Sequence, residues 1–105
     1  MTELDQTFAA LSDGTRRAII EKLALGEASL SDLAAPFSMS QTAVSKHVRV
    51  LSDAGLVSVI KRGRTRYCTL EAEPMKAATD WLNTYQKFWG DTFEALARHI
   101  EGERQ

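Results

Sequence analysis

The sequence predicts a mainly α-helical domain with a small β-hairpin, in the order α-α-α-α-β-β-α. Two changes in the spacing of apolar residues carry this prediction. Up to Gly55, apolar residues recur every three or four positions, which is the period of an amphipathic helix. After Gly55 they alternate with polar residues over two short runs, as in strands, and from Pro74 the helical period returns.

Length and composition predict a single globular domain spanning residues 1–105. Of the 105 residues, 44% are hydrophobic and 26% are charged, which is ordinary for a folded protein with one core. No apolar run approaches the roughly 20 residues that cross a bilayer. The N-terminus is acidic and lacks the apolar stretch of a signal peptide, so we expect a cytoplasmic protein.

The first two helices are predicted by apolar spacing and by residues that favour helix ends. Residues 2–12 place three apolar side chains on one helical face: Leu4, Phe8 and Leu11. Asp13 is typical of helix starts and Gly26 of helix ends, so a second helix is expected between them. Its inward-facing side chains are Ile19, Ile20 and Leu23.

Two further helices follow at a short interval. Ser29, with Asp32 three residues later, indicates the start of a short third helix that Pro36 ends. After a tight connection, Ser40 favours the start of a fourth helix, which Gly55 stops. A short helix, a tight turn and a second helix form the arrangement known as a helix-turn-helix.

Positive charge is concentrated in the middle of the chain, although the net charge is only −1. Residues 38–68 contain six cations and one anion, whereas the rest of the chain contains seven cations and thirteen anions. A protein with no net positive charge can still present a basic face to a polyanion. The distribution therefore favours a nucleic-acid partner.

The fourth helix carries a polar face of unusual composition. At 100° per residue, one side of it collects seven polar residues: Gln41, Thr42, Ser45, Lys46, Arg49, Ser52 and Asp53. This face has one acid and begins with short hydroxyls and an amide, which can approach base edges or phosphates closely. Arg49 lies at its centre and is long enough to reach a guanine or a phosphate. The opposite, apolar side should anchor the helix on the core.

The two β-rich runs are predicted to pair as a hairpin around residues 62–65. Gly63 permits the tight turn. Four cations fall within six residues at the tip or edge of this hairpin: Lys61, Arg62, Arg64 and Arg66. Such charges repel one another unless a polyanion is close, so the hairpin is suited to lie along phosphates or in a minor groove.

Three stretches give the sequence a clear resemblance. In order, "ALSDGTRR", "SQTAVSKHVRVLSDAGLV" and "GRTRYCTL" resemble the ArsR-type winged helix-turn-helix transcriptional repressors, and the likeness covers nearly the whole chain. Gly14 is a departure, because the family often has proline there. The resemblance implies a homodimer joined through its first and last helices, in which the fourth helix reads double-stranded DNA and the hairpin is the wing.

The resemblance also assigns candidate DNA-binding residues. On the fourth helix and its start they are Ser40, Gln41, Thr42, Ser45, Lys46 and Arg49, and on the wing Arg62, Arg64 and Arg66. Two of them have a structural alternative, because Ser40 can serve only as a helix cap and Ser45 only as a small packing residue. His47 lies in the apolar arc and is interpreted as a buried, hydrogen-bonded structural residue. Arg16 and Arg17 are interpreted as a solvated helix face.

A long last helix, from Pro74 to about Ile100, is expected to supply a subunit interface. Its apolar residues follow alternating steps of three and four, and aromatic residues broaden the stripe beyond what one small domain can bury. The predicted interface comprises Leu4, Phe8, Leu11, Leu82, Tyr85, Trp89, Phe93 and Leu96. The alternative is that these aromatics complete the core of a monomer.

No metal or other cofactor is expected. Metal-sensing relatives use cysteines in the third helix or Asp, His and Glu ligands on the last one, and the third helix here has neither Cys nor His. The resemblance is therefore to the subgroup without metal sites, similar to autorepressors. The lone Cys68 excludes an internal disulfide and leaves two interpretations open, a buried inert thiol or a redox-responsive one.

Two other classes of function fit the sequence less well than a DNA-binding repressor does. A winged-helix module that binds only proteins would not need the cationic hairpin or the small polar first turn of the fourth helix. An enzyme is disfavoured because His47 and His99 lie on separate helices and no nucleophile is paired with a base. The operator, the regulated genes and the inducing signal, whether a small molecule or a protein, do not follow from the sequence.

Overall fold

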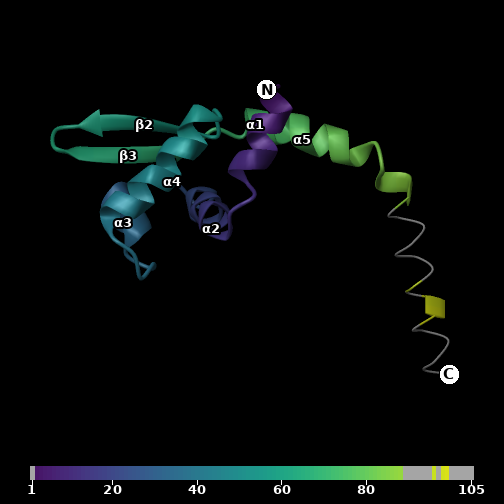
Figure 1. The fold of residues 1–105 in the computed structure, drawn as a ribbon, viewed down its shortest axis with the longest axis horizontal. Coiled ribbons are helices and arrows are strands. Elements are labelled where there is room, and N and C mark those ends of the chain that lie inside the picture. The colour runs from purple at the N-terminus through teal and green to yellow at the C-terminus, as the bar shows by residue number, and fades with distance from the viewer. Residues whose placement is uncertain (1, 89–95, 97, 100–105) are drawn as a thin grey trace.

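The structure, a computed structural model, describes residues 2–88, 96, 98 and 99. Its elements follow the predicted order with one short strand added (Figure 1). In chain order they are α1 (Glu3–Ala10), α2 (Gly14–Leu23), β1 (Ala28–Ser29), α3 (Leu30–Ala34), α4 (Gln41–Asp53), β2 (Val57–Arg62), β3 (Thr65–Leu70) and α5 (Glu73–Asn83). None of the described helices is long and apolar enough to span a membrane.

The predicted helix caps are confirmed. The side chains of Asp13, Ser29 and Ser40 each accept a hydrogen bond, at 3.1 Å, from the backbone N–H three residues further on. Thr2 and Asp5 form a reciprocal capping box at the start of α1. Each bond satisfies a backbone N–H that has no partner within its own helix, so these side chains fix where the helices begin.

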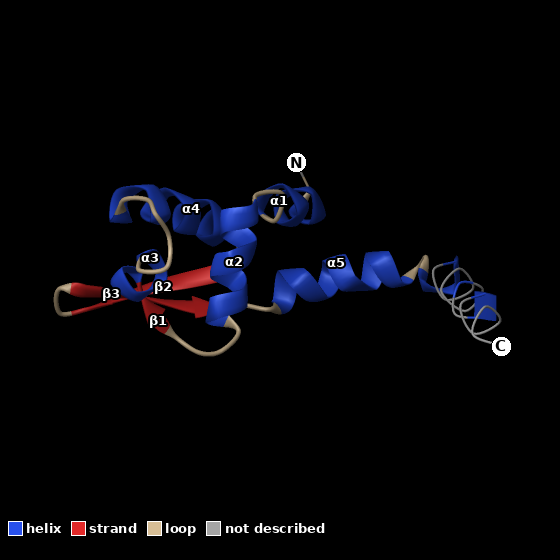
Figure 2. Ribbon diagram, turned by 90° about the horizontal axis from the view of Figure 1, so that it is seen from below, coloured by secondary structure: helices blue, strands red, loops and turns tan. Residues whose placement is uncertain are grey.

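The small sheet has three antiparallel strands in the order β1-β3-β2 (Figure 2). The turn between β2 and β3 contains only Gly63 and Arg64, and Gly63 has φ of 63°. Arg64, the second central residue, does not have a positive φ, and a positive φ at the first central residue alone is the signature of a type II′ hairpin turn. The edge strand β1 was not predicted. It pairs Ala28 with Cys68, and two residues are too few to show the alternation that identifies a strand.

The core lies between α2, α3, α4 and the sheet. Its fully buried apolar side chains include Ile19, Leu33, Val44, Leu51 and Leu56. The predicted inward residues of α2, Ile19, Ile20 and Leu23, are all buried. Because α3 and α4 contribute Leu33 and Leu51 to the same core, the polar face of α4 is held outward in a fixed orientation.

A turn interrupts the predicted last helix. Helix α5 begins at Glu73, with Pro74 second, and ends at Asn83, and a turn at Thr84 and Tyr85 follows it. The N–H groups of Thr84 and Tyr85 bond to carbonyls three residues back, and the Thr84 hydroxyl donates to the Asp80 carbonyl. Backbone hydrogen bonds that span three residues instead of four tighten the last turn of a helix and close it. The Thr84 hydroxyl also competes with backbone N–H groups for a carbonyl acceptor. Beyond the turn, residues 86–88, 96, 98 and 99 are helical as predicted, and residues 89–95, 97 and 100 lie outside the described residues.

Candidate nucleic-acid interface

The polar face of α4 is exposed as predicted. Val44, Val48 and Leu51, at spacings of four and three, are buried against the core. Gln41, Thr42, Lys46 and Arg49 are exposed, and Ser45 is half-buried. Val50 departs from the predicted apolar side, because 41% of it is exposed.

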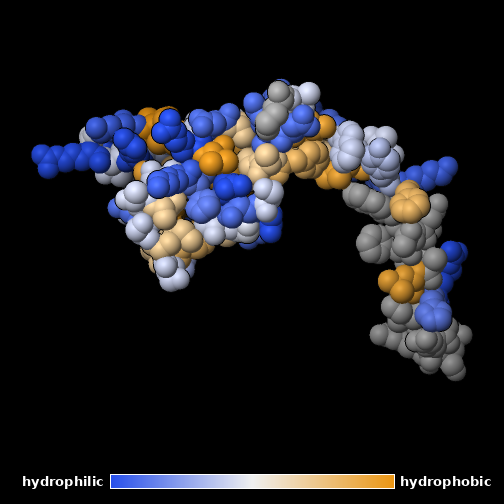
Figure 3. All heavy atoms as spheres, viewed as in Figure 1, coloured by the Kyte–Doolittle hydropathy of each residue, from blue (hydrophilic) through white to orange (hydrophobic). Residues whose placement is uncertain are grey.

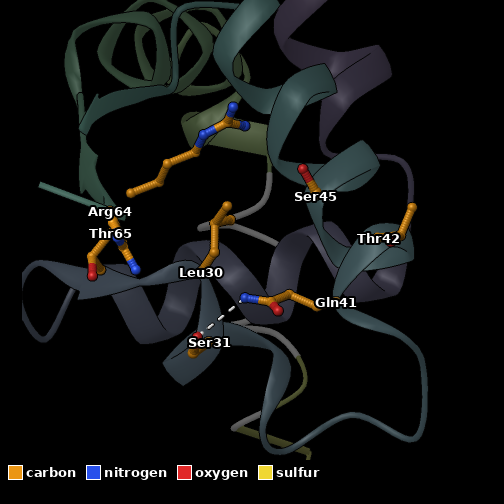
Figure 4. A pocket seen from close by; sticks show the side chains of 8 residues that line it. Leu30, Ser31, Gln41, Thr42, Ser45, Arg64 and Thr65 are labelled. Carbon is orange, nitrogen blue, oxygen red and sulfur yellow. Dashed lines mark hydrogen bonds between the residues drawn. The ribbon is translucent and has the colours of Figure 1, made fainter. Parts of the chain in front are cut away.

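A cleft of about 380 Å³ lies between the start of α4, α3 and the hairpin (Figure 4). Its lining residues come from all three elements and are mostly polar: Leu30, Ser31, Gln41, Thr42, Ser45, Arg64, Thr65 and Arg66. A second cleft of about 250 Å³ shares Leu30, Ser45 and Arg66 with the first and extends along the helix to Arg49. The two clefts thus form one concave surface between the recognition helix and the hairpin, which we call the reading groove.

Strand register decides which hairpin cations face this groove. Arg66 lies two residues before the buried Cys68 on β3, so both side chains point to the face of the sheet that covers the core. Arg64 lies at the turn and also lines the groove. In Figure 3 the tip of the hairpin is strongly hydrophilic. Together Arg49, Arg64 and Arg66 give the reading groove a positive potential suited to a polyanion.

Arg62 does not line the reading groove. It pairs with Thr65 on the opposite face of the hairpin, and its guanidinium lies 5.1 Å from the centre of the Tyr67 ring. Two of its nitrogens each lie 3.1 Å from an oxygen of Glu27. Of the nine predicted DNA-binding residues, six line the reading groove, whereas Ser40, Lys46 and Arg62 do not.

The contacts of Ser40, Ser45 and His47 bear on their structural alternatives. Ser40 caps α4 through its oxygen, and its hydroxyl proton remains available to a phosphate. Ser45 is half-buried and lines both clefts. His47 is not deeply buried. A quarter of its side chain is exposed, and its Nδ1 lies 3.4 Å from an Arg16 nitrogen and 3.8 Å from an Asp13 oxygen.

The expectation that Arg16 and Arg17 form a solvated face is correct for Arg17, which is exposed, and wrong for Arg16, which is half-buried. Arg16 donates to the carbonyls of Ala10 and Ala9, at 2.6 and 3.2 Å, and Arg17 donates to the carbonyl of Leu11 at 2.7 Å. Helix α1 has no basic residue in its own last turn, so these arginines from α2 supply the positive charge that a helix C-terminus favours. Their part is to join α1 to α2.

An aromatic row runs from α1 to α5. The rings of Phe8 and Trp81 meet edge to face with centroids 5.7 Å apart, and those of Trp81 and Tyr85 with centroids 5.4 Å apart. Nearly half of Trp81 is exposed, and Phe8, Tyr85 and Leu96 are exposed as well, whereas Leu4, Leu11 and Leu82 are half-buried. Apolar surface gathers where α1 meets α5 (Figure 3). Of the predicted interface residues, Trp89 and Phe93 lie outside the described residues.

The structure bears on both the lone cysteine and the possible metal ligands. Cys68 is fully buried on β3, and burial raises the pKa of its thiol, which keeps it protonated. Among residues 2–88, 96, 98 and 99, no three His, Cys, Asp or Glu side chains are grouped closely enough to hold a metal ion.

Comparison with known proteins agrees with this geometry. A family model described as a helix-turn-helix domain matches residues 11–60. The HTH-type transcriptional regulator Rv2034 of Mycobacterium tuberculosis is 36% identical over 99 residues, covering 94% of this chain and 90% of its own. The transcriptional repressor SdpR of Bacillus subtilis is 29% identical over 79 residues, covering 75% of this chain and 88% of its own.

Solved structures show the same likeness. The crystal structure of an ArsR family transcriptional regulator superposes with a TM-score of 0.77 at 41% identity, covering 84% of this chain and 91% of its own. An ArsR-like transcriptional regulator from Rhodococcus sp. RHA1 gives a TM-score of 0.69 at 32% identity, covering 90% and 89%. With its recognition helix and wing framing one groove, the chain belongs to the ArsR family and is a DNA-binding transcriptional regulator with a winged helix-turn-helix fold.

Proposed function

We propose that the protein is a cytoplasmic, sequence-specific repressor that binds an inverted-repeat operator as a homodimer. The reading groove carries this proposal, because it combines small polar groups from α4 with Arg49, Arg64 and Arg66 on one concave surface. Such groups hydrogen-bond base edges and phosphates, and a surface with no DNA partner would have no need to hold these cations together. A protein-interaction module without DNA binding explains the groove less well.

Each element has a role in this proposal. The start of α4 enters the major groove and presents Gln41 and Thr42 to base edges, while Arg49 reaches a guanine or a phosphate. Ser40, Ser45 and Lys46 contact the backbone or bases near the same end. Arg64 and Arg66 follow the phosphates or enter the adjacent minor groove. Arg62, on the other face of the hairpin, is paired with Glu27 and makes no DNA contact in this proposal.

The exposed aromatic row supports a homodimer. Phe8, Trp81 and Tyr85 form continuous apolar surface on α1 and α5, of the kind that protein interfaces cover. A two-fold axis there would place two recognition helices in successive major grooves, roughly 34 Å apart, on an inverted repeat. A homodimeric winged helix-turn-helix domain from Mycobacterium bovis has the same fold, with a TM-score of 0.66 at 23% identity.

We also propose that the repressor does not respond to metals and has no catalytic role. The described part of α3 carries no Cys or His, and burial protects Cys68 from acting as a redox sensor. A redox-responsive repressor is the second candidate, and its test is the reactivity of Cys68.

The proposal is tested by selecting binding sites for the purified protein from a pool of random duplex DNA. We expect an inverted repeat whose half-site centres lie about ten base pairs apart. We also expect two subunits per site, and repression of a reporter gene placed behind the selected site. A protein that retains no duplex from the pool, or that binds one half-site as a monomer, would contradict the proposal.

A further inference from the structure

The side chain of Gln41 is held by a neighbour on a different helix. Its Nε2 donates a hydrogen bond to the Oγ of Ser31 at 3.1 Å (Figure 4). Gln41 is the first residue of α4 and Ser31 the second of α3, ten positions earlier. Both side chains are exposed and both line the reading groove. The contact therefore lies on the surface that faces DNA.

The two backbones that carry this pair are themselves fixed. Helix α3 is anchored by the fully buried Leu33 and begins with the Ser29 cap. The start of α4 is fixed by the Ser40 cap, and Val44, one turn further on, is fully buried. Because neither helix end can shift easily, the hydroxyl of Ser31 is a fixed acceptor that selects one orientation of the Gln41 amide.

We infer that Ser31 is a specificity-determining residue, which positions Gln41 to read adenine; this inference rests on the proposed function. A glutamine amide has two N–H donors and one oxygen acceptor. The hydrogen bond to Ser31 uses one of these N–H donors, so the second N–H and the oxygen remain available to pair with a base. Adenine presents an acceptor at N7 and a donor at N6 in the major groove, which matches that remaining pair. Guanine presents two acceptors there and does not match.

The size of the expected effect follows from the cost of immobilising the Gln41 side chain when DNA binds. An exposed glutamine samples many rotamers, and immobilising such a side chain on binding weakens affinity by about two- to tenfold. In this protein Ser31 restricts the amide before DNA arrives. Loss of the hydroxyl should therefore reduce the preference for adenine at one position in each half-site by about two- to tenfold, and leave the other positions unchanged.

The experiment compares binding sites selected from random duplex DNA by the wild type, four single variants and one double variant of Ser31 and Gln41. Ser31→Ala removes the acceptor, Ser31→Thr keeps it, and Gln41→Ala removes the reader. Ser38→Ala is the matched control, because Ser38 is an exposed serine on the α3–α4 connection with no hydrogen bond to Gln41. Helix content is measured for each variant, and alanine at position 31 is compatible with a helix.

We expect Gln41→Ala to abolish one adenine preference, Ser31→Ala to weaken the same one, and Ser31→Thr and Ser38→Ala to retain it. The double variant of Ser31 and Gln41 should match Gln41→Ala alone, because Ser31 acts through Gln41. An unchanged binding motif for Ser31→Ala would overturn the inference. So would a finding that Ser31→Ala changes the motif as much in the Gln41→Ala variant as it does in the wild type. Failure of the wild type to select any duplex would instead overturn the proposed function.

Discussion

Arg62 and Glu27 form a two-armed ion pair across the sheet. Nη1 and Nη2 of the arginine each lie 3.1 Å from a different carboxylate oxygen. Glu27 directly precedes the edge strand β1, so the pair links that strand to the end of β2. Within the described residues, Lys61, Arg64 and Arg66 have no acidic partner within 4.0 Å. The wing thus presents three unneutralised cations and one that the protein itself neutralises.

Removing the charge of Glu27 should therefore strengthen DNA binding. Glu27→Gln releases the Arg62 guanidinium and raises the net charge of the wing by one. We expect tighter binding to non-specific duplex DNA, with a log–log salt slope steeper by up to about 0.9, the value for one added phosphate contact. Glu21→Gln makes the same charge change at an exposed site on α2, and equal effects of both variants would refute a special part for the pair.

A charge in the aromatic row should separate the subunits. Phe8→Glu places a carboxylate against Trp81, where a dimer interface would bury it without a partner. We expect light scattering to show monomers and operator affinity to fall by at least about tenfold, because paired half-sites bind together. Leu25→Glu is the control, since Leu25 is 90% exposed on the loop after α2. A Phe8→Glu dimer as stable as the wild type would show that the interface lies elsewhere.

The Cys68 thiol should be unreactive in the native protein. It is fully buried, and burial raises its pKa, so little thiolate forms at neutral pH. We expect a thiol reagent such as iodoacetamide to label it only as fast as the chain unfolds, and to label it rapidly in denaturant. Rapid labelling under native conditions, with loss of DNA binding, would favour the redox-responsive alternative.

Asp13 should make stability depend on pH in the acid range. The N–H of Arg16, which donates to its carboxylate, is the main reason that its pKa falls below the ordinary value of 3.8. A pKa that is lower in the folded state gives stability that is present above the unfolded value and is lost as pH falls through the folded one. We expect the free energy of unfolding to decrease below about pH 4.

Asp13→Asn keeps a capping side chain and removes this titration. Urea denaturation should therefore show a shallower loss of stability on acidification in Asp13→Asn than in the wild type. Asp80→Asn, which removes an exposed carboxylate on α5, should leave the wild-type profile in place. Parallel profiles for the wild type and Asp13→Asn would contradict the assignment.

Features set by neighbouring residues were predictable from the sequence. The caps at Asp13, Ser29 and Ser40 depend on contacts three residues apart, and the glycine turn at Gly63 depends on local backbone geometry. The buried and exposed sides of α4 followed from helical periodicity, with Val50 as the exception. These properties fix the helix-turn-helix and most of the reading groove.

Features set by distant residues were not predictable. The ion pair of Arg62 joins residues 35 positions apart, and the contact of Arg16 with His47 joins residues 31 positions apart. Strand β1 is defined by its pairing with β3 and has no pattern of its own. The turn after Asn83 has a different origin, because local backbone hydrogen bonds form it and apolar spacing does not report them.

The most direct test of the DNA-reading surface is the affinity of the protein for its selected operator, measured against salt for the wild type and Arg49→Ala. We expect wild-type affinity to fall steeply and linearly on a log–log plot, as phosphate-bound counterions are released. Arg49→Ala should lose about 1–3 kcal/mol of operator binding with unchanged helix content and subunit association. Affinity that does not vary with salt, or that Arg49→Ala leaves intact, would contradict the account.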